Sequence, residues 1–159
     1  CLADIYSHFG VTTTFGNDFI TLKKDKDTSK ETLIRNLKDA PDIAQTIAVT
    51  CFAEGIACHL SGLHTLKIKE TDRLVALHDE LTKLGAKINI TDETLEVLTA
   101  SSINDNIAID TYNDHRMAMA FAPLALRVSI KINDAEVVTK SYQKFWNDME
   151  QIGINITHL

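Results

Sequence analysis

The sequence predicts an α/β (α+β repeat) fold with buried helices and outer sheets, and three observations predict it. A pattern of amphipathic helix, glycine and strand occurs three times, at Gly10, Gly85 and Gly153. Two other segments, 43–53 and 117–126, are apolar on nearly every side, as buried helices are. The strand candidates alternate apolar and polar residues, which is typical of a sheet with one wet face. The helices are therefore expected in the middle of the domain.

Each of the three glycines follows a helix that carries apolar residues one, four and eight positions before it. This spacing puts those residues on one helical face. Glycine adopts the left-handed conformation easily, so it suits the end of a helix. Strand candidates follow the glycines at 11–15 and 19–22, at 86–90 and 95–98, and at 154–158, and they follow the two apolar helices at 56–60 and 128–132.

These patterns indicate a single partial domain over residues 1–159, built of β-α-β-α-β-β units. Residues 1–22 are interpreted as the end of one unit, 31–99 as a second and 100–159 as most of a third. The charged segment 23–30 connects the first two. A repeat of this length exceeds the roughly 20–50 residues of open solenoids, so a closed pseudo-symmetric domain is expected.

Composition narrows the class of protein. Hydrophobic residues make up 45% of the 159 residues and charged residues 24%, which is ordinary for a soluble globular domain. The net charge of -6 argues against nucleic acid and anionic membranes as partners. With no apolar run near the roughly 20 residues of a membrane helix and no leader pattern, a cytoplasmic location is expected. The three cysteines and six histidines lack metal-ligand spacing, so neither a metal nor a cofactor is predicted.

Asp42 and Asp114 each open one of the two apolar helices. The first interpretation of both is an N-cap, because Asp accepts backbone N–H bonds at a helix start. The functional alternative for Asp42 is a carboxylate that receives a proton from a substrate hydroxyl. Pro123 is expected to kink the second helix.

Lys69 and Arg73 flank another helix start, where Thr71 is a plausible cap and Asp72 suits the first turn. A capped start with a solvated charge run is one interpretation. Positive charge at a helix N-terminus opposes the macrodipole, however, unless an anion binds there. Arginine can hold phosphate or carboxylate through two hydrogen bonds.

Arg116 lies in the first turn of an apolar helix, where its charge must reach a rim, a partner or a ligand. Lys140 precedes the last helix at the matching place in the repeat. Helix starts of successive units gather at one end of such a domain. We therefore expect one cleft for a multiply anionic small molecule, with cations and two carboxylates for proton transfer. Its residues would be Lys69, Arg73, Arg116 and Lys140, with Asp42 and Glu70 between them.

Four segments carry a resemblance to a known family: PDIAQTIAVTCFAEG, GLHTLKIKETDRL, TYNDHRMAMAFAPLAL and VVTKSYQKFW. They resemble the C-terminal signatures of the 3-phosphoshikimate 1-carboxyvinyltransferase (EPSP synthase) family, and the likeness covers essentially the whole chain. It implies an enolpyruvyl transferase-like fold of two domains, each with three β-α-β-α-β-β units, so an N-terminal domain is expected outside this fragment. It also implies transfer of the enolpyruvyl group of phosphoenolpyruvate to shikimate 3-phosphate, with release of phosphate and no cofactor, in aromatic amino-acid biosynthesis (the shikimate pathway).

The resemblance also implies roles for single residues. Asp42 matches the general base beside the accepting hydroxyl, and Glu70 matches an acid/base residue near the enol carbon. Asp42 and Lys69 match the shikimate 3-phosphate site. The matches to phosphoenolpyruvate ligands are Arg73, Arg116 and Lys140. His115 matches a neighbouring site residue of less certain role.

Two positions depart from the family pattern: Thr65 stands where some members have a substrate-binding Asn, and Gln143 where Pro is common. Two alternatives stay open, namely the related transferase that acts on a UDP-sugar (UDP-N-acetylglucosamine) and a non-catalytic binding module. The motif pair KETDR and NDHRMAM favours the shikimate enzyme over the UDP-sugar transferase. The clustered cations and carboxylates argue against a non-catalytic module, which would not need them. The isolated fragment is expected to be inactive, because the family's cleft closes between two domains.

Overall fold

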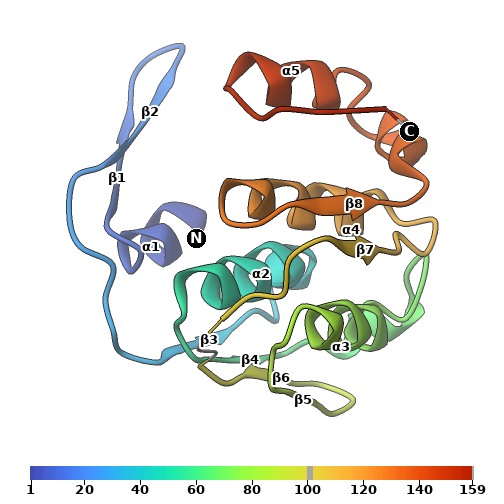
Figure 1. The fold of residues 1–159 in the computed structure, drawn as a ribbon. Coiled ribbons are helices and arrows are strands. Elements are labelled where there is room, and N and C mark those ends of the chain that lie inside the picture. The colour runs from blue at the N-terminus through green and yellow to red at the C-terminus, as the bar shows by residue number, and fades with distance from the viewer. Residues whose placement is uncertain (100–101, 159) are drawn as a thin grey trace.

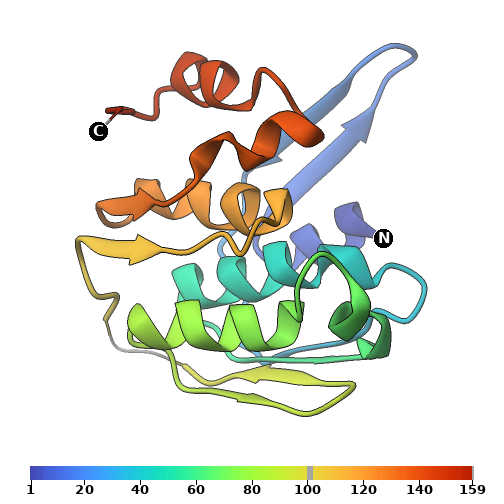
Figure 2. The ribbon, with the colours of Figure 1, turned by 90° about the vertical axis from the view of Figure 1, so that its right-hand side faces the viewer.

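The computed structural model describes residues 1–99 and 102–158. The first elements are the helix α1 (Leu2–Ser7) and the antiparallel strands β1 (Val11–Phe15) and β2 (Ile20–Lys24). The hairpin extends away from the rest of the chain, as Figure 2 shows. Every residue of β2 is exposed. The hairpin predicted after Gly10 is confirmed.

Residues 33–97 contain the predicted order β-α-β-α-β-β. The elements are β3 (Leu33–Asn36), α2 (Ala44–Glu54), β4 (Cys58–Ser61), α3 (Arg73–Lys83), β5 (Ile88–Ile90) and β6 (Leu95–Val97). The four strands form one sheet in the order β3-β4-β6-β5, in which β3 is parallel to β4 and the other pairs are antiparallel. The parallel pair is possible because α2 crosses between the two strands.

The last part of the chain pairs β7 (Ile107–Ile109) in parallel with β8 (Ile130–Ile132), and α4 (His115–Phe121) crosses between them. The last helix is α5 (Phe145–Gln151). Short 3-10 helices join the elements: η1 (Pro41–Ile43), η2 (His64–Ile68), η3 (Ala122–Leu126) and η4 (Ala135–Lys140). Because Pro123 lacks an N–H, the α-helical bonding of α4 cannot continue through it, and α4 turns into η3 at the position of the predicted kink.

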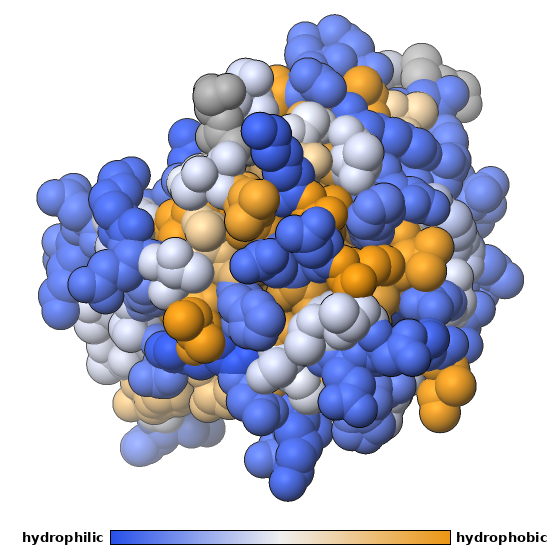
Figure 3. Space-filling model, turned by 90° about the horizontal axis from the view of Figure 1, so that it is seen from below, coloured by the Kyte–Doolittle hydropathy of each residue, from blue (hydrophilic) through white to orange (hydrophobic). Residues whose placement is uncertain are grey.

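The predicted burial of the apolar helices is confirmed. Seven of the eleven residues of α2 are buried, and α4 buries Met117, Ala118, Ala120 and Phe121. Both helices lie between the β1–β2 hairpin, the four-stranded sheet and the β7–β8 pair (Figure 1). Hydrophilic residues spread over the outer face of the molecule below that sheet, with apolar residues between them (Figure 3). The sheets therefore cover the helices from outside, as expected.

One predicted strand is wrong. Residues 154–158 have no regular secondary structure, although Ile154 is buried against the small cluster that includes Phe145 and Met149. A strand needs a partner to pair its backbone groups, and among the described residues no strand pairs with this segment. The division into three units remains a prediction, and its residues 100, 101 and 159 lie outside those described. In the described residues, no helix combines the length and apolarity needed to cross a bilayer.

Candidate functional site

Arg73 occupies the centre of a charged cluster at the starts of three helices. Its side chain is 2% exposed, and its guanidinium bonds to three carboxylates. Nε donates to Asp114 at 2.6 Å, Nη1 to Asp42 at 2.7 Å and Nη2 to Glu70 at 2.7 Å. A second, longer bond of 3.4 Å joins Nη2 to Asp114. The planar fork of arginine thus gathers carboxylates from η1, the segment before α3 and the start of α4.

The carboxylate of Asp42 contacts three cationic side chains. Besides Arg73, Lys69 Nζ lies 3.4 Å from Oδ1 and Arg116 Nη2 lies 3.5 Å from Oδ2. Arg116 also donates to the backbone carbonyl of Asp42 at 3.2 Å. Burial alone would raise the pKa of the Asp42 carboxyl, but Arg116, Lys69 and Arg73 together outweigh burial, so the pKa lies below its usual value. Asp42 is therefore ionised at neutral pH.

The capping roles differ from those predicted. Asp42 caps no helix: its carboxylate faces the cations, and α2 begins after η1 without a side-chain cap. Asp72, and not Thr71, caps α3 by accepting the N–H groups of Leu74 and Val75. Asp114 does cap α4, through the N–H of Arg116 at 2.8 Å, while the same carboxylate bonds to Arg73. The cap interpretation was therefore right only for Asp114.

The remaining predicted residues lie around this centre. Lys140, at the end of η4, is exposed and donates to Asn113 at the side-chain oxygen (2.7 Å) and the carbonyl (3.2 Å). Asn113 directly precedes the cap of α4, so Lys140 joins the segment that carries Arg116. His115 Nδ1 lies 3.9 Å from Asp114 Oδ1. Contacts join six of the seven predicted residues, directly or through Asp114: Asp42, Lys69, Glu70, Arg73, His115 and Arg116. The seventh, Lys140, contacts Asn113, the chain neighbour of Asp114.

Part of the cluster is accessible to solvent. Arg73 and Asp114 are buried, whereas the side chains of Lys69, Glu70 and Arg116 are 32–42% exposed. With four cationic groups against three carboxylates, the cluster has an excess of one positive charge. Because Arg73 already bonds three carboxylates, Arg116 and Lys140 are the cations better placed to meet an anion from solution.

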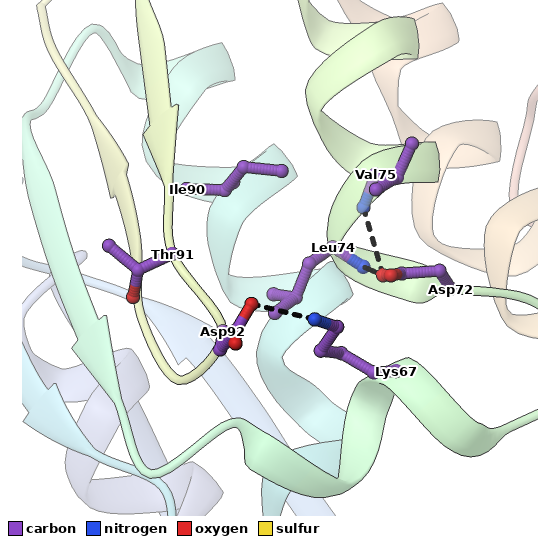
Figure 4. Close-up of a pocket in the computed structure, with 7 residues that line it drawn as sticks. All are labelled: Lys67, Asp72, Leu74, Val75, Ile90, Thr91 and Asp92. Carbon is purple, nitrogen blue, oxygen red and sulfur yellow. Dashed lines mark hydrogen bonds and ion pairs between the residues drawn. The ribbon is translucent and has the colours of Figure 1, made fainter.

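Two other features near the cluster carry less weight. Glu70, Asp114 and His115 place possible ligand atoms within 4.8 Å of one another, but both carboxylates already bond to Arg73. A shallow pocket of about 130 Å³ lies between the start of α3 and the β5–β6 turn, where an ion pair joins Lys67 to Asp92 (Figure 4). It shares no lining residue with the cluster, and its small volume suits no substrate of drug size.

Sequence reasoning missed three contributors. It interpreted Asp114 as a cap alone, and it did not assign Asn113 or Glu80. Glu80 is fully buried in α3 and accepts hydrogen bonds from Tyr112 and from the backbone of Asp110, in the segment before α4. A signal did exist, since Glu80 lies three residues after Leu77 and four before Leu84, which places it on the apolar face of its helix. A charged residue on that face needs a buried partner.

The sequence of this chain is similar to those of known transferases. Residues 1–149 match the family described as EPSP synthase (3-phosphoshikimate 1-carboxyvinyltransferase). A 3-phosphoshikimate 1-carboxyvinyltransferase of Bacteroides fragilis (strain YCH46) is 40% identical over 157 residues, which cover 97% of this chain and 38% of that protein. One from Methanospirillum hungatei is 34% identical and covers 97% of this chain and 36% of that protein. The chain thus spans well under half the length of these relatives.

Solved structures share the fold. An EPSP synthase from Acinetobacter baumannii superposes with a TM-score of 0.82 at 22% identity, over 97% of this chain and 39% of that one. The enolpyruvyl transferase NikO from Streptomyces tendae gives a TM-score of 0.66 at 15% identity. At these identities the structures support the architecture alone, while the family match extends over nearly the whole sequence. The chain therefore belongs to the EPSP synthase (3-phosphoshikimate 1-carboxyvinyltransferase) family.

Proposed function

We propose that this chain forms one side of the catalytic cleft of a 3-phosphoshikimate 1-carboxyvinyltransferase. The enzyme would transfer the enolpyruvyl group of phosphoenolpyruvate to shikimate 3-phosphate in the cytoplasm, with an N-terminal domain of the same enzyme completing the cleft. One observation carries the proposal: an ionised carboxylate, Asp42, lies among Lys69, Arg73 and Arg116, at the starts of helices that the sequence repeat brings together. Such a site suits two anionic substrates and proton transfer between them.

The first step joins the two substrates. The shikimate hydroxyl oxygen attacks C2 of phosphoenolpyruvate while its proton passes to Asp42, and Glu70 protonates the methylene carbon C3. Bond formation at C2 and protonation at C3 give a tetrahedral intermediate. Because Glu70 and Asp42 both contact Arg73, one guanidinium holds the two proton-transfer groups at a fixed separation. Preorganised groups of this kind lower the barrier without reorganising during the reaction.

The second step releases phosphate. Glu70, left without its proton by the first step, takes a proton from C3, the double bond re-forms between C2 and C3, and the bond from C2 to the phosphate oxygen breaks. The proton held by Asp42 leaves with the phosphate, so both carboxyl groups return to their starting states. Arg116 and Lys140 would bind the phosphate and carboxylate of phosphoenolpyruvate and neutralise the charge that grows on the leaving group. Lys69 would hold the phosphate of shikimate 3-phosphate. Arg73 would bind phosphoenolpyruvate only if one of its carboxylate partners turned away, since its donors are engaged.

The test uses the complete enzyme that contains this chain. Asp42→Asn should lower kcat by about 10²–10⁴-fold, the usual contribution of a general base, while shikimate 3-phosphate still binds. Arg116→Ala should lower kcat/KM for phosphoenolpyruvate by at least about 30-fold, the lower end for removing one member of a charge pair. Matched controls outside the cluster are Asp39→Asn and Arg127→Ala, which should retain activity. Full activity in Asp42→Asn, or turnover with a UDP-sugar and not with shikimate 3-phosphate, would refute the proposal.

A further inference from the structure

Besides Asp114, a second carboxylate is buried, and it lies on the same face of α3 as Arg73. Glu80 follows Arg73 by two helical turns and is 0% exposed. Burial of a carboxylate is costly unless hydrogen bonds and opposite charge compensate for it. Lys83 supplies the charge, because its Nζ donates to both oxygens of Glu80 at 2.8 and 2.9 Å. The proposed catalytic steps make no use of either residue.

The other partners of Glu80 belong to the segment that leads into α4. Tyr112 donates its hydroxyl to Oε1 at 2.6 Å, and the backbone N–H of Asp110 donates to Oε2 at 3.1 Å. Lys83 also reaches the Asp110 carboxylate at 2.7 Å. Burial, together with the bond to Glu80, raises the pKa of Tyr112, so the phenol stays protonated and keeps donating. Glu80 therefore holds this segment through hydrogen bonds from the side chain of Tyr112 and from the backbone of Asp110.

The segment that Glu80 holds has an uncommon backbone conformation. Tyr112 and Asn113 both adopt the left-handed region, with φ of 53° and 58°. Residues with a Cβ rarely adopt it, and two in succession persist only when the surroundings determine them. Here α3 holds the segment on both sides, with Glu80 bonded to Tyr112 and Arg73 bonded to Asp114.

This turn sets the positions of two cations. It presents the carbonyl and side-chain oxygens of Asn113 to Lys140, and it brings Asp114 to the N–H of Arg116. If the turn relaxed, Lys140 would lose both of its acceptors on Asn113. The backbone of Arg116 would lose its bond to Asp114, and its guanidinium would keep only the contacts with Asp42. Lys69 belongs to the segment before α3, and neither its backbone nor its contact with Asp42 involves this turn, so its position does not depend on the turn.

We propose that Glu80 and Tyr112 form a clamp that positions residues 110–116, and with them Arg116 and Lys140, for binding phosphoenolpyruvate. Both are positioning residues, since they act through the turn. The inference rests on the function proposed above for the identity of the ligand. The effect of Glu80 and Tyr112 on the turn does not depend on that function and can be measured separately.

Tyr112→Phe tests the clamp, because it removes the hydroxyl and leaves the ring. Tyr6→Phe is the matched control: the Tyr6 hydroxyl lies 3.1 Å from Thr50 Oγ1, is half-buried, and joins α1 to α2 away from the cluster. The first measurement is amide hydrogen exchange of residues 110–117 in this chain. The second is the KM for each substrate in the complete enzyme.

In Tyr112→Phe we expect faster exchange across residues 110–117 and a rise of about tenfold in the KM for phosphoenolpyruvate, the usual effect of losing a hydrogen bond to a charged group. The KM for shikimate 3-phosphate should change less than twofold, and Tyr6→Phe should change neither quantity. A purely structural role would not separate the two substrates. Unchanged exchange, or equal changes in both KM values, would overturn the proposal. If the unaltered enzyme has no transferase activity but exchange still rises in Tyr112→Phe, the clamp on the turn stands and the proposed function fails.

Discussion

At the scale of single residues, the guanidinium of Arg73 and the carboxylate of Asp114 stand out for their burial: their side chains are 2% and 0% exposed. A buried charge is tolerated only with a partner of opposite charge and with its hydrogen bonds made. Arg73 meets this condition for Asp114 and at the same time binds the half-exposed carboxylates Asp42 and Glu70. One residue thus contributes both to the stability of the fold and to the arrangement of the site.

Arg73→Met tests this contribution. The substitution leaves Asp114 buried without its charge partner, so it should lower the free energy of unfolding by about 3–5 kcal/mol, as removal of one member of a buried pair does. The matched control is Arg127→Met, because Arg127 is half-exposed and pairs with the single carboxylate of Glu54 at 2.7 Å. The control should cost less than about 1 kcal/mol. Urea unfolding of this chain measures both, and an equal cost in the two variants would contradict the assignment.

At the scale of elements, the predicted glycine stops fall where the helices end. Gly10 and Gly153 both have positive φ, 79° and 100°. Their surroundings differ, however. A Cβ added at Gly10 would lie 2.1 Å from the carbonyl oxygen of Lys26, whereas nothing lies within 4 Å of one added at Gly153. The first glycine therefore also permits a close approach between the end of α1 and the chain that follows the β1–β2 hairpin.

Alanine substitutions at these two glycines distinguish the cost of backbone strain from the cost of a steric clash. Gly153→Ala should cost only the left-handed conformation, about 1–2 kcal/mol. Gly10→Ala should cost a further 1–3 kcal/mol or so, because the backbone of Lys26 must shift to admit the methyl group. The midpoint of urea unfolding, measured on each variant of this chain, checks the difference. If both substitutions had the same effect, the contact at Lys26 would be irrelevant to stability.

Local patterns predicted the helices and most strands, because the apolar spacing and the glycine stops are properties of neighbouring residues. Contacts between distant residues were not predictable in the same way. Asp42 has the sequence context of a cap, yet it turns to Arg73 and Arg116, which lie 31 and 74 positions away. The prediction of a strand after Gly153 was wrong for a related reason, since the backbone pairing of a strand depends on a partner strand elsewhere in the sequence. The proximity of the candidate residues was predictable because the repeat brings helix starts together, but the partner of each residue within the cluster was not.

At the scale of the whole molecule, the helix starts that carry the charged groups face solvent at one end of the core. Asp42, Glu70 and Arg116 each keep 37–42% of their side chains exposed, and Lys140 is exposed as well. Electrostatic catalysis is effective where water is excluded and the dielectric constant is low. In this chain the described residues leave Asp42 and Glu70, the proposed proton-transfer groups, accessible to water. The chain also spans only about 38% of its relative from Bacteroides fragilis.

The chain alone is therefore expected to be inactive, even with its cluster assembled. Incubated with phosphoenolpyruvate and shikimate 3-phosphate, it should release no more phosphate than a sample without protein, whereas the complete enzyme should turn over. The Asp42→Asn variant of the isolated chain is the control for contaminating phosphatase, because a contaminant would be indifferent to that substitution. Phosphate release by the isolated chain that disappears in Asp42→Asn would contradict the prediction. It would show that this cluster needs no second domain to exclude water, and that the cations around Asp42 suffice for the chemistry.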